Sequence, residues 1–421
     1  MPARRSREIS KDRYFPTRAL AAVAGLALAL LLLAPAAASA SVGSQITSIL
    51  SRHGLAGSET SVGVYDLTGK RALFDLRWDV LRLPASNEKL VTSAAALADW
   101  SAAHRFGTEL DGPVAGPDAA GVLDGDVYLK GLGDPSLKTA GLGVFVAKLR
   151  SFGITKITGR VLADDGYFDA LRTAPSWRPG MVAYCGPLSA LTLNEGFGPN
   201  GRYVADPALW AAAKLTQLLR AAGIKVVHAA ARGVVPADAT RLGSESSAAL
   251  QHVLAWMNKQ SDDFYAEELL KGLGASFGGA GTTAAGATVA VQGLNALGVT
   301  DGFRVRDGSG LSYQDKLSAH AIVKLLGAMS RRADFATYLG SLSIAGKDGT
   351  LSYRMKGTRA AGNVHGKTGT LAAASCLSGY VTSTDGHLLA FSILMNGSGL
   401  SQAKAHDAQD KIAEALAATA P

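Results

Sequence analysis

Cysteine is scarce in this chain, and clustered metal ligands are missing from it. The 421 residues include two Cys and eight scattered His, with no His-Glu-x-x-His pair. Two thiols cannot form a disulfide framework or a four-thiolate zinc site, and dispersed histidines do not indicate a metal centre. The sequence therefore predicts a protein that uses neither a metal nor another cofactor.

Positive charge is also less abundant than the net value of +8 suggests. Six of the 42 basic and two of the 34 acidic residues lie in the first forty positions, so the remainder carries only +4. That remainder has no Lys/Arg-rich run interleaved with aromatics, which argues against a nucleic-acid partner. With 48% hydrophobic and 18% charged residues, the chain is expected to fold into two or more packed domains.

The first forty residues have the pattern of an export signal. Six basic residues precede the apolar stretch 19–34, and Ala38-Ser39-Ala40 supplies the small residues of a cleavage site. The stretch is short for a membrane span, although an uncleaved anchor stays open as an alternative. We expect residues 1–40 to be a signal peptide and the remainder to act in the periplasm or at the cell wall, free or membrane-associated.

The hydrophobic patterns after the leader predict a mixed α/β protein. Strands are expected at 61–65, 71–76, 377–382 and 388–394, and helices at 86–100, 142–152, 207–222 and 403–417. Strands near both ends, with helices between them, predict that the two ends meet in one sheet. Short apolar runs divided by Gly, Asp and Pro predict an inserted α/β region at 107–242, and residues 278–286 are expected to form a flexible loop.

The first sign of chemistry is the segment Ser86-Asn87-Glu88-Lys89. Residues three apart share a helix face, so the Ser86 hydroxyl and the Lys89 amine can meet. A serine becomes a nucleophile only with a base beside it, and a lysine serves as that base only where its surroundings lower its pKa. The pattern alone is weak, because it recurs at Ser401 and Lys404, which we expect on a solvated helix face.

A second segment, Lys367-Thr368-Gly369-Thr370, precedes a predicted strand. It offers a cation and hydroxyl groups for a carboxylate, and its glycine leaves room for a peptide to lie along a strand edge. The backbone N–H groups of Ser86 and Thr370 would then form an oxyanion hole. Taken alone, the same letters also fit an ordinary turn before a strand.

The two segments in this order resemble the signature of penicillin-binding proteins and serine β-lactamases. Further blocks at 84–90, 131–137, 189–191, 307–312, 346–351 and 366–371 narrow the match. Over nearly all of its length after the leader, the chain resembles the D-alanyl-D-alanine carboxypeptidase/endopeptidase family, the type-4 (class C) low-molecular-mass penicillin-binding proteins.

This resemblance implies a fold and an activity. The fold would be an α+β penicillin-binding domain, a sheet with flanking helices formed by residues 41–106 and 243–421, with residues 107–242 inserted. The activity would be cleavage of peptidoglycan stem peptides, with β-lactams as inhibitors. By resemblance, the catalytic residues are Ser86 as nucleophile, Lys89 as base and Ser261 as proton relay, and the substrate carboxylate is held by Lys367, Thr368 and Thr370.

One position departs from the family pattern. The family's middle motif is Ser-Asp-Asn, but here it is Ser261-Asp262-Asp263. An ionised carboxylate cannot donate a hydrogen bond as an amide does, and near Lys89 it would favour the ammonium form. We therefore expect Asp263 to border the substrate site and to slow acylation. A protonated Asp263, or a catalytically impaired protein that only binds peptidoglycan, are the alternatives; a β-lactamase would need a deacylating base that the sequence does not identify.

Several other residues allow two interpretations. Cys185 and Cys376 are expected either to pair in an oxidising compartment or to stay as two buried thiols. Asp164-Asp165 fit turn and cap residues better than ligands, and the run Asp307-Gly308-Ser309-Gly310 fits a tight turn better than the alternative of an active-site loop. The oligomeric state is not predicted by the sequence.

Overall fold

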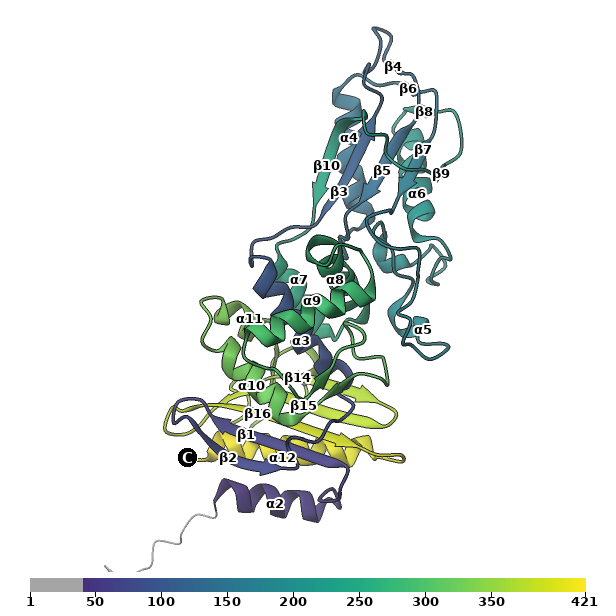
Figure 1. Ribbon diagram of the computed structural model, residues 1–421. Coiled ribbons are helices and arrows are strands. Elements are labelled where there is room, and N and C mark those ends of the chain that lie inside the picture. The colour runs from purple at the N-terminus through teal and green to yellow at the C-terminus, as the bar shows by residue number, and fades with distance from the viewer. Residues whose placement is uncertain (1–40) are drawn as a thin grey trace, which may run out of the picture. The chain divides into compact units, whose positions relative to one another are not determined.

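The structure is a computed structural model that describes residues 41–421 (Figure 1). The predicted signal peptide, residues 1–40, lies outside the described residues. Within residues 41–421, no helix combines the length and the hydropathy that a membrane span requires. The division into a peptidase domain and an inserted region stays a prediction.

The central element is a six-stranded antiparallel sheet. Its strand order is β13 (Ser343–Ile344), β14 (His365–Leu371), β15 (Ala374–Thr382), β16 (Leu388–Asn396), β1 (Thr60–Asp66) and β2 (Arg71–Leu76). Strands β1 and β16 pair along their whole length, with Thr60 opposite Met395. The prediction that the two ends of the sequence meet in one sheet is therefore confirmed.

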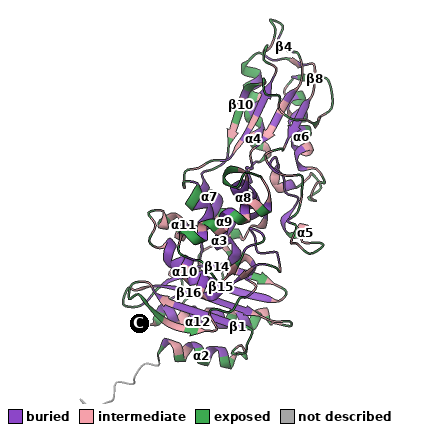
Figure 2. Cartoon of the chain, viewed as in Figure 1, coloured by how far each residue is buried: buried purple, intermediate pink, exposed green. Residues whose placement is uncertain are grey.

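Both faces of this sheet are covered by helices, because its strands are apolar on both sides (Figure 2). On β15, Leu377 and Val381 pack with α2 (Val42–Arg52) and α12 (Gln402–Ala418). The alternate residues Cys376 and Tyr380 pack on the opposite face. On that face α10 (Ala319–Met329) packs against β16 and β1. The same hydrophobic core continues into α3 (Glu88–Asp99), α7 (Leu250–Gln260), α8 (Asp263–Phe277), α9 (Thr283–Ala296) and α11 (Phe335–Ser341).

A separate hydrophobic core is formed entirely by residues between Leu110 and Leu242. Its main sheet has the order β10 (Thr240–Ser246), β3 (Gly107–Gly112), β5 (Val127–Gly131), β7 (Val161–Asp164) and β9 (Ala231–Arg232). A smaller sheet joins β4 (Val122–Leu123), β6 (Lys156–Ile157) and β8 (Lys225–Val226). Helices α4 (Thr139–Ser151) and α6 (Pro207–Ala221) complete this core, and the short α5 (Val182–Cys185) follows a long loop. The predicted helices at 142–152 and 207–222 are confirmed.

The expectation of a flexible loop over residues 278–286 is wrong in its second half, because α9 begins at Thr283. The Thr282 side chain caps the helix by accepting a hydrogen bond from the Ala285 N–H at 3.0 Å. Gly286 lies against the backbone of Leu270 on α8, where a Cβ would collide with the Leu270 carbonyl. This glycine therefore permits close helix packing rather than flexibility.

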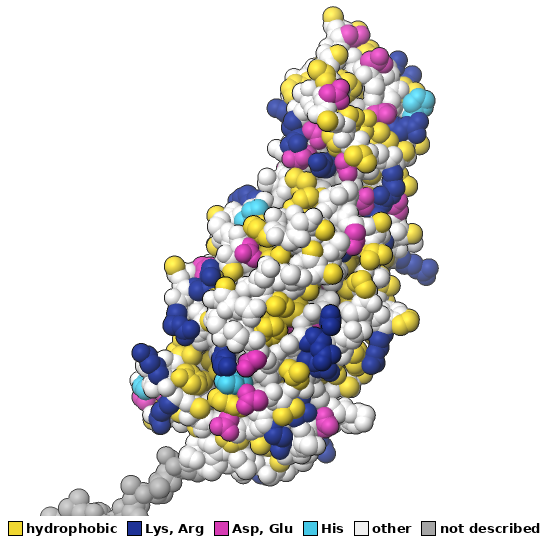
Figure 3. Space-filling view, in the orientation of Figure 1, with side chains coloured by type: hydrophobic (Ala, Val, Ile, Leu, Met, Phe, Trp, Pro, Cys, Tyr) yellow, Lys and Arg dark blue, Asp and Glu magenta, His cyan; other side chains and the backbone are white. Residues whose placement is uncertain are grey.

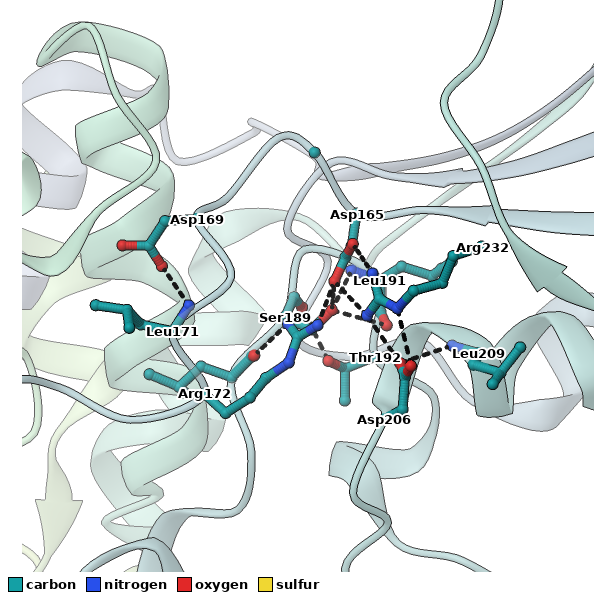
Figure 4. A network of polar contacts seen from close by, with 12 residues as sticks. Asp165, Asp169, Leu171, Arg172, Ser189, Leu191, Thr192, Asp206, Leu209 and Arg232 are labelled. Atoms are coloured by element: carbon teal, nitrogen blue, oxygen red, sulfur yellow. Dashed lines mark hydrogen bonds and ion pairs between the residues drawn. The ribbon is translucent and has the colours of Figure 1, made fainter.

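Asp165 begins a turn, as the sequence predicts, because its carbonyl accepts a hydrogen bond from the Phe168 N–H at 3.2 Å, and its side chain lies at the centre of a network of polar and charged side chains (Figure 4). It accepts hydrogen bonds from Arg172 and Ser189, both at 2.8 Å, and from Arg232 at 2.7 Å. The neighbouring Asp164 also serves a turn by accepting from the Gly166 N–H. Because the Ser189 N–H donates to Glu268 of α8 at 3.0 Å, the network connects the inserted region to a helix that borders the site.

Candidate active site

The Ser86 hydroxyl lies one helical turn before the Lys89 amine, as the spacing predicts. Ser86 belongs to the short 3₁₀ helix η1 (Ala85–Asn87), and Lys89 to the first turn of α3. The distance from Lys89 Nζ to Ser86 Oγ is 3.0 Å. Ala85 has a φ of 47°, a left-handed conformation that costs energy for a residue with a side chain. The nucleophile candidate thus lies on a strained turn.

Lys89 is completely buried and contacts three hydrogen-bond acceptors. Besides Ser86 Oγ, they are Asp263 Oδ1 at 2.6 Å and the Ser309 carbonyl at 2.8 Å. Three acceptors match the three protons of an ammonium group. The structure therefore presents Lys89 as one half of an ion pair with Asp263, the residue that departs from the family motif.

Ser261 and Lys367 form the second hydrogen-bonded pair of the site. Ser261 follows α7 with a φ of 58° and accepts a hydrogen bond from Lys367 Nζ at 2.8 Å. Burial lowers the pKa of Lys367 well below its usual value, and the nearby positive charge of Lys89 lowers it further, whereas Asp263 opposes both effects. The ammonium group of Lys367 can therefore give up a proton to Ser261 more readily than an exposed lysine would.

Strand β14 offers an open edge beside Ser86. Its outer neighbour β13 pairs only with His365 and Gly366, so the strand from Lys367 onward is paired on one side, with β15. A Cβ at Gly369 would lie 3.1 Å from the Ser86 N atom and 2.7 Å from the Pro84 carbonyl oxygen, which explains the need for glycine here. An extended peptide can lie along such an edge.

A groove of about 320 Å³ opens at this edge. Ser86, Asp263 and Thr370 line it, together with Met181 and Tyr184 from the inserted region. Thr370 is exposed there, and Thr368 Oγ1 donates a hydrogen bond to Thr350 Oγ1 at 2.8 Å. Thr350, Met181 and Tyr184 are site residues that the sequence analysis missed; Thr350 lies in a block quoted for the resemblance, whereas nothing local marks the other two.

Buried carboxyl groups support the loop that holds Lys89. Glu267 Oε1 accepts hydrogen bonds from the backbone N–H groups of Gly308 and Ser309, which orients the Ser309 carbonyl toward Lys89. Burial, reinforced by the charge of Asp307, raises the pKa of Glu267 well above its usual value. The run that the sequence assigned to a tight turn thus also positions the base candidate.

The eight predicted site residues form a group of three, a pair and a stretch of one strand. Ser86, Lys89 and Asp263 are hydrogen-bonded to one another through Lys89, Ser261 contacts Lys367, and Thr368, Gly369 and Thr370 follow along β14. Cys185 and Cys376 are both free and buried, so of the two alternatives for these thiols the unpaired one is observed. Within residues 41–421, no group of His, Cys, Asp and Glu has the geometry of a metal site.

The fold and the site together define a serine peptidase of the penicillin-binding class. The sequence matches the D-Ala-D-Ala carboxypeptidase 3 (S13) family over residues 42–200 and 198–419. The chain belongs to this family, which confirms the family and the enzyme class that the motifs predict.

Individual relatives agree with this assignment. The D-alanyl-D-alanine carboxypeptidase of Actinomadura sp. (strain R39) is 33% identical over 434 residues, which cover 84% of this chain and 80% of the relative. The crystal structure of penicillin binding protein 4 from Haemophilus influenzae superposes with a TM-score of 0.79 at 20% identity, over 89% of this chain and 99% of that one. A second structure of that protein, complexed with a β-lactam, has a TM-score of 0.74 at 21% identity, covering 87% and 98%. These structures confirm the predicted fold class.

Proposed function

We propose that this chain hydrolyses the D-alanyl-D-alanine bond of peptidoglycan stem peptides through an acyl-enzyme on Ser86. The observation that carries the proposal is the 3.0 Å contact between Ser86 Oγ and Lys89 Nζ beside the open edge of β14. A hydroxyl next to a buried amine, facing a strand edge that can bind an extended peptide, is the arrangement that nucleophilic catalysis on a peptide requires. Family membership supports the same reaction.

In the first step, Ser86 Oγ attacks the carbonyl carbon between the two D-alanines. The hydroxyl proton passes to Lys89 once that amine is neutral. The negative charge on the carbonyl oxygen is stabilised by the backbone N–H groups of Ser86 and Thr370, across the close approach of Gly369 to η1. The C–N bond then breaks, and the leaving amine of D-alanine receives a proton from the Ser261 hydroxyl.

Ser261 regains its proton from Lys367, whose Nζ lies 2.8 Å away. The carboxylate of the terminal D-alanine lies near the Thr368 and Thr370 hydroxyls, and the Lys367 charge acts on it from the buried side of β14. Water then cleaves the ester on Ser86: its OH group completes the carboxyl of the released peptide, and Lys89 returns its proton to Ser86 Oγ. The remaining proton of the water passes through Ser261 to Lys367, so that both lysines and both serines are restored. A β-lactam would form the same ester and stall there, and a cross-linked peptide would make the reaction an endopeptidase cleavage.

The leader that the sequence predicts at residues 1–40 fits this substrate, because peptidoglycan is built outside the cytoplasm. We propose that the protein is exported and acts in the periplasm or at the cell wall. The open groove requires no partner chain for its chemistry, since all of the proposed roles are taken by residues of this chain.

The direct test is covalent labelling by fluorescent penicillin together with D-alanine release from a stem pentapeptide. The wild-type protein should be labelled on Ser86, as mass spectrometry of the tryptic peptide would show, and should release D-alanine. The Ser86→Ala variant should do neither, whereas Ser401→Ala, which alters the other Ser-x-x-Lys segment, should retain both activities. An unlabelled wild-type protein that releases no D-alanine would contradict the proposal.

A further inference from the structure

Four fully buried acidic side chains adjoin one another near the base candidate. They are Glu88 of α3, Glu267 of α8, and Asp307 and Asp315, which lie on one loop. We call them the carboxyl cluster. Acidic side chains on the surface are interspersed with Lys and Arg (Figure 3), whereas those of the carboxyl cluster have one another as neighbours. None of the four lines the groove at the nucleophile, and the proposed reaction uses none of them.

Three members of the carboxyl cluster hold the segment 306–312 by its backbone. They accept hydrogen bonds from six N–H groups: those of Arg306 and Asp307 for Asp315, of Gly308 and Ser309 for Glu267, and of Gly310 and Ser312 for Asp307. The carbonyl groups of the segment are thereby free to face α3. The Ser309 carbonyl accepts from Lys89 at 2.8 Å, and the Gly308 carbonyl accepts from Thr92 at 2.7 Å.

Glu88 is the member of the carboxyl cluster without such a bond. Neither of its carboxyl oxygens has a hydrogen-bond partner in residues 41–421. The segment packs directly on this part of the chain, because a Cβ at Gly310 would collide with the Ala85 carbonyl and would lie 3.1 Å from the Glu88 Cβ. The Glu88 carboxyl is therefore enclosed between α3 and the segment, out of contact with solvent.

The surroundings of Glu88 disfavour its ionised form. Burial raises the pKa of Glu88 well above its usual value, and the carboxyl groups of Asp307 and Glu267 raise it further, whereas Lys89 opposes them. Asp315 also interacts with Glu88 as a like charge. A buried carboxylate without hydrogen bonds costs far more than a neutral acid. Glu88 therefore keeps its proton at a pH at which an exposed glutamate has lost it.

We propose that Glu88 is a positioning residue for the acylation of Ser86 and that it acts as the neutral acid. Neutral Glu88 allows the segment 306–312 to pack on α3, which keeps the Ser309 carbonyl on Lys89. The Lys89 amine is then held where it can accept the Ser86 proton. This inference rests on the proposed peptidase reaction, in which Lys89 is the base.

Ionisation of Glu88 reverses this effect. When hydroxide removes the Glu88 proton, forming water and a carboxylate, the new charge repels Asp307 and Glu267. Because these two side chains hold the segment by its N–H groups, the segment moves away from α3 and the Ser309 carbonyl leaves Lys89. Acylation then slows as the pH rises.

The first measurement is the second-order rate of fluorescent-penicillin labelling of Ser86 between pH 6 and pH 9.5. Glu88→Gln has the size of the neutral acid but cannot ionise. Its rate relative to the wild type should lie within twofold of one at pH 6 and should rise at least threefold by pH 9.5. A smaller rise, or a ratio outside that range at pH 6, overturns the proposal.

Glu268→Gln is the matched control, because it removes another buried acid with a raised pKa. Glu268 accepts from the Ser189 N–H, which lies outside the segment 306–312. The labelling rate of Glu268→Gln relative to the wild type should stay within twofold of one from pH 6 to pH 9.5, although its stability changes. An equal rise in both variants would mean that folded stability sets the pH dependence, and it would overturn the proposal.

A second measurement does not require peptidase activity. Trp177 Nε1 donates to Asp307 Oδ2 at 2.8 Å, so the NMR signal of its indole N–H reports the position of that carboxyl. This signal, assigned with Trp177→Phe, should move between pH 6 and pH 9.5 in the wild type and less than half as far in Glu88→Gln. A larger movement in the variant, or none in the wild type, overturns the proposal. A wild type that is not labelled at any pH would contradict the peptidase reaction, whereas the indole signal would still decide whether Glu88 controls the segment.

Discussion

Asp263 and Lys89 form the closest charged contact at the site, at 2.6 Å, where the family motif has an asparagine. Lys89 is completely buried and the Asp263 side chain is 16% exposed, so water screens the pair little. The Asp263 carboxylate thus engages the same Lys89 amine that has to accept the Ser86 proton. We infer that the ion pair between Lys89 and Asp263 slows the acylation of Ser86.

Asp263→Asn should therefore accelerate acylation. Removing the charged partner releases the Lys89 amine from the ion pair, so that it can serve Ser86, and the new amide can donate to a substrate carbonyl. We expect the second-order rate of fluorescent-penicillin labelling to rise by at least about tenfold, since 1.4 kcal/mol of barrier corresponds to that factor.

The neighbouring Asp262→Asn is the matched control for this change. Asp262 accepts hydrogen bonds from the Tyr265 N–H and Trp256 Nε1 and interacts with Lys89 only at longer range, so its substitution should accelerate labelling much less than Asp263→Asn does. A labelling rate of Asp263→Asn equal to or below that of the wild type would refute the electrostatic argument.

Among the site residues, the sequence indicated those that lie close together along the chain. It did not indicate those that act through a backbone group. Ser86 and Lys89 were predictable because a helical turn brings i and i+3 together. The Ser309 carbonyl that accepts from Lys89 was not, because every residue has a carbonyl and only the tertiary fold decides which one lies beside a given side chain. Glu267, which orients that carbonyl, was hidden for the same reason.

Helix α8 contains two adjacent buried glutamates. Glu267 and Glu268 are both almost fully buried, and Oε2 of each has no hydrogen-bond partner in residues 41–421. Burial raises the pKa of Glu268 from 4.5 to about 8, against the opposing effect of Lys271 and the Ser189 N–H. The folded protein therefore favours the protonated form of Glu268.

Replacement of Glu268 by Gln should change how stability depends on pH. A raised pKa in the folded state means that the contribution of Glu268 is complete below pH 4.5 and is lost as the pH rises through about 8. Gln mimics the protonated acid, so the stability of the variant relative to the wild type should rise by about 5 kcal/mol as the pH rises from 4.5 to about 8. Urea unfolding at several pH values measures this difference.

The partly exposed Glu245 has no comparable burial, and Glu245→Gln is the control. The stability of the Glu245→Gln variant should depend on pH in the same way as that of the wild type. If Glu268→Gln also followed that dependence, the raised pKa would be wrong.

Local sequence patterns predicted the helices and strands whose bounds are not changed by tertiary packing. Strand β2 (Arg71–Leu76) has the predicted bounds, and β15 and β16 extend only slightly beyond theirs. The start of α9 was missed, because the glycines before and within it suggested a loop. The absence of a side chain at Gly286 instead allows α9 to pack closely against α8, and no local pattern reveals that contact.

For the molecule as a whole, the network around Asp165 is the connection that merits a test. Burial alone would raise the pKa of Asp165. Hydrogen bonds from Arg232, Ser189 and Arg172 outweigh that effect and lower this pKa to about 2. The carboxylate thus stabilises the fold above its usual pKa of 3.8, and this stabilisation is lost as the pH falls through about 2.

Asp165→Asn should lower the free energy of unfolding at pH 7 by about 2 kcal/mol, and the difference from the wild type should shrink as the pH falls from 4 to 2. Chemical unfolding followed by tryptophan fluorescence provides the measurement. Asp238→Asn, at an exposed position, should have no effect. Equal stability of Asp165→Asn and the wild type at pH 7 would show that the network is not stabilising.

The architecture was largely predictable at this scale because motifs spread along the chain carry the family resemblance. The charged network was not, since Asp165, Arg172, Ser189 and Arg232 have no common spacing. Only the packed structure brings them together (Figure 4).

The pairing of β1 with β16 has a consequence for the order of folding. Thr60 is made early in synthesis, but its partner Met395 comes near the end. The central sheet therefore cannot close until almost the whole polypeptide has been synthesised, and contacts of such large sequence separation form slowly. The surroundings of Ser86, which include β14 of this sheet, are therefore completed only at the end of folding.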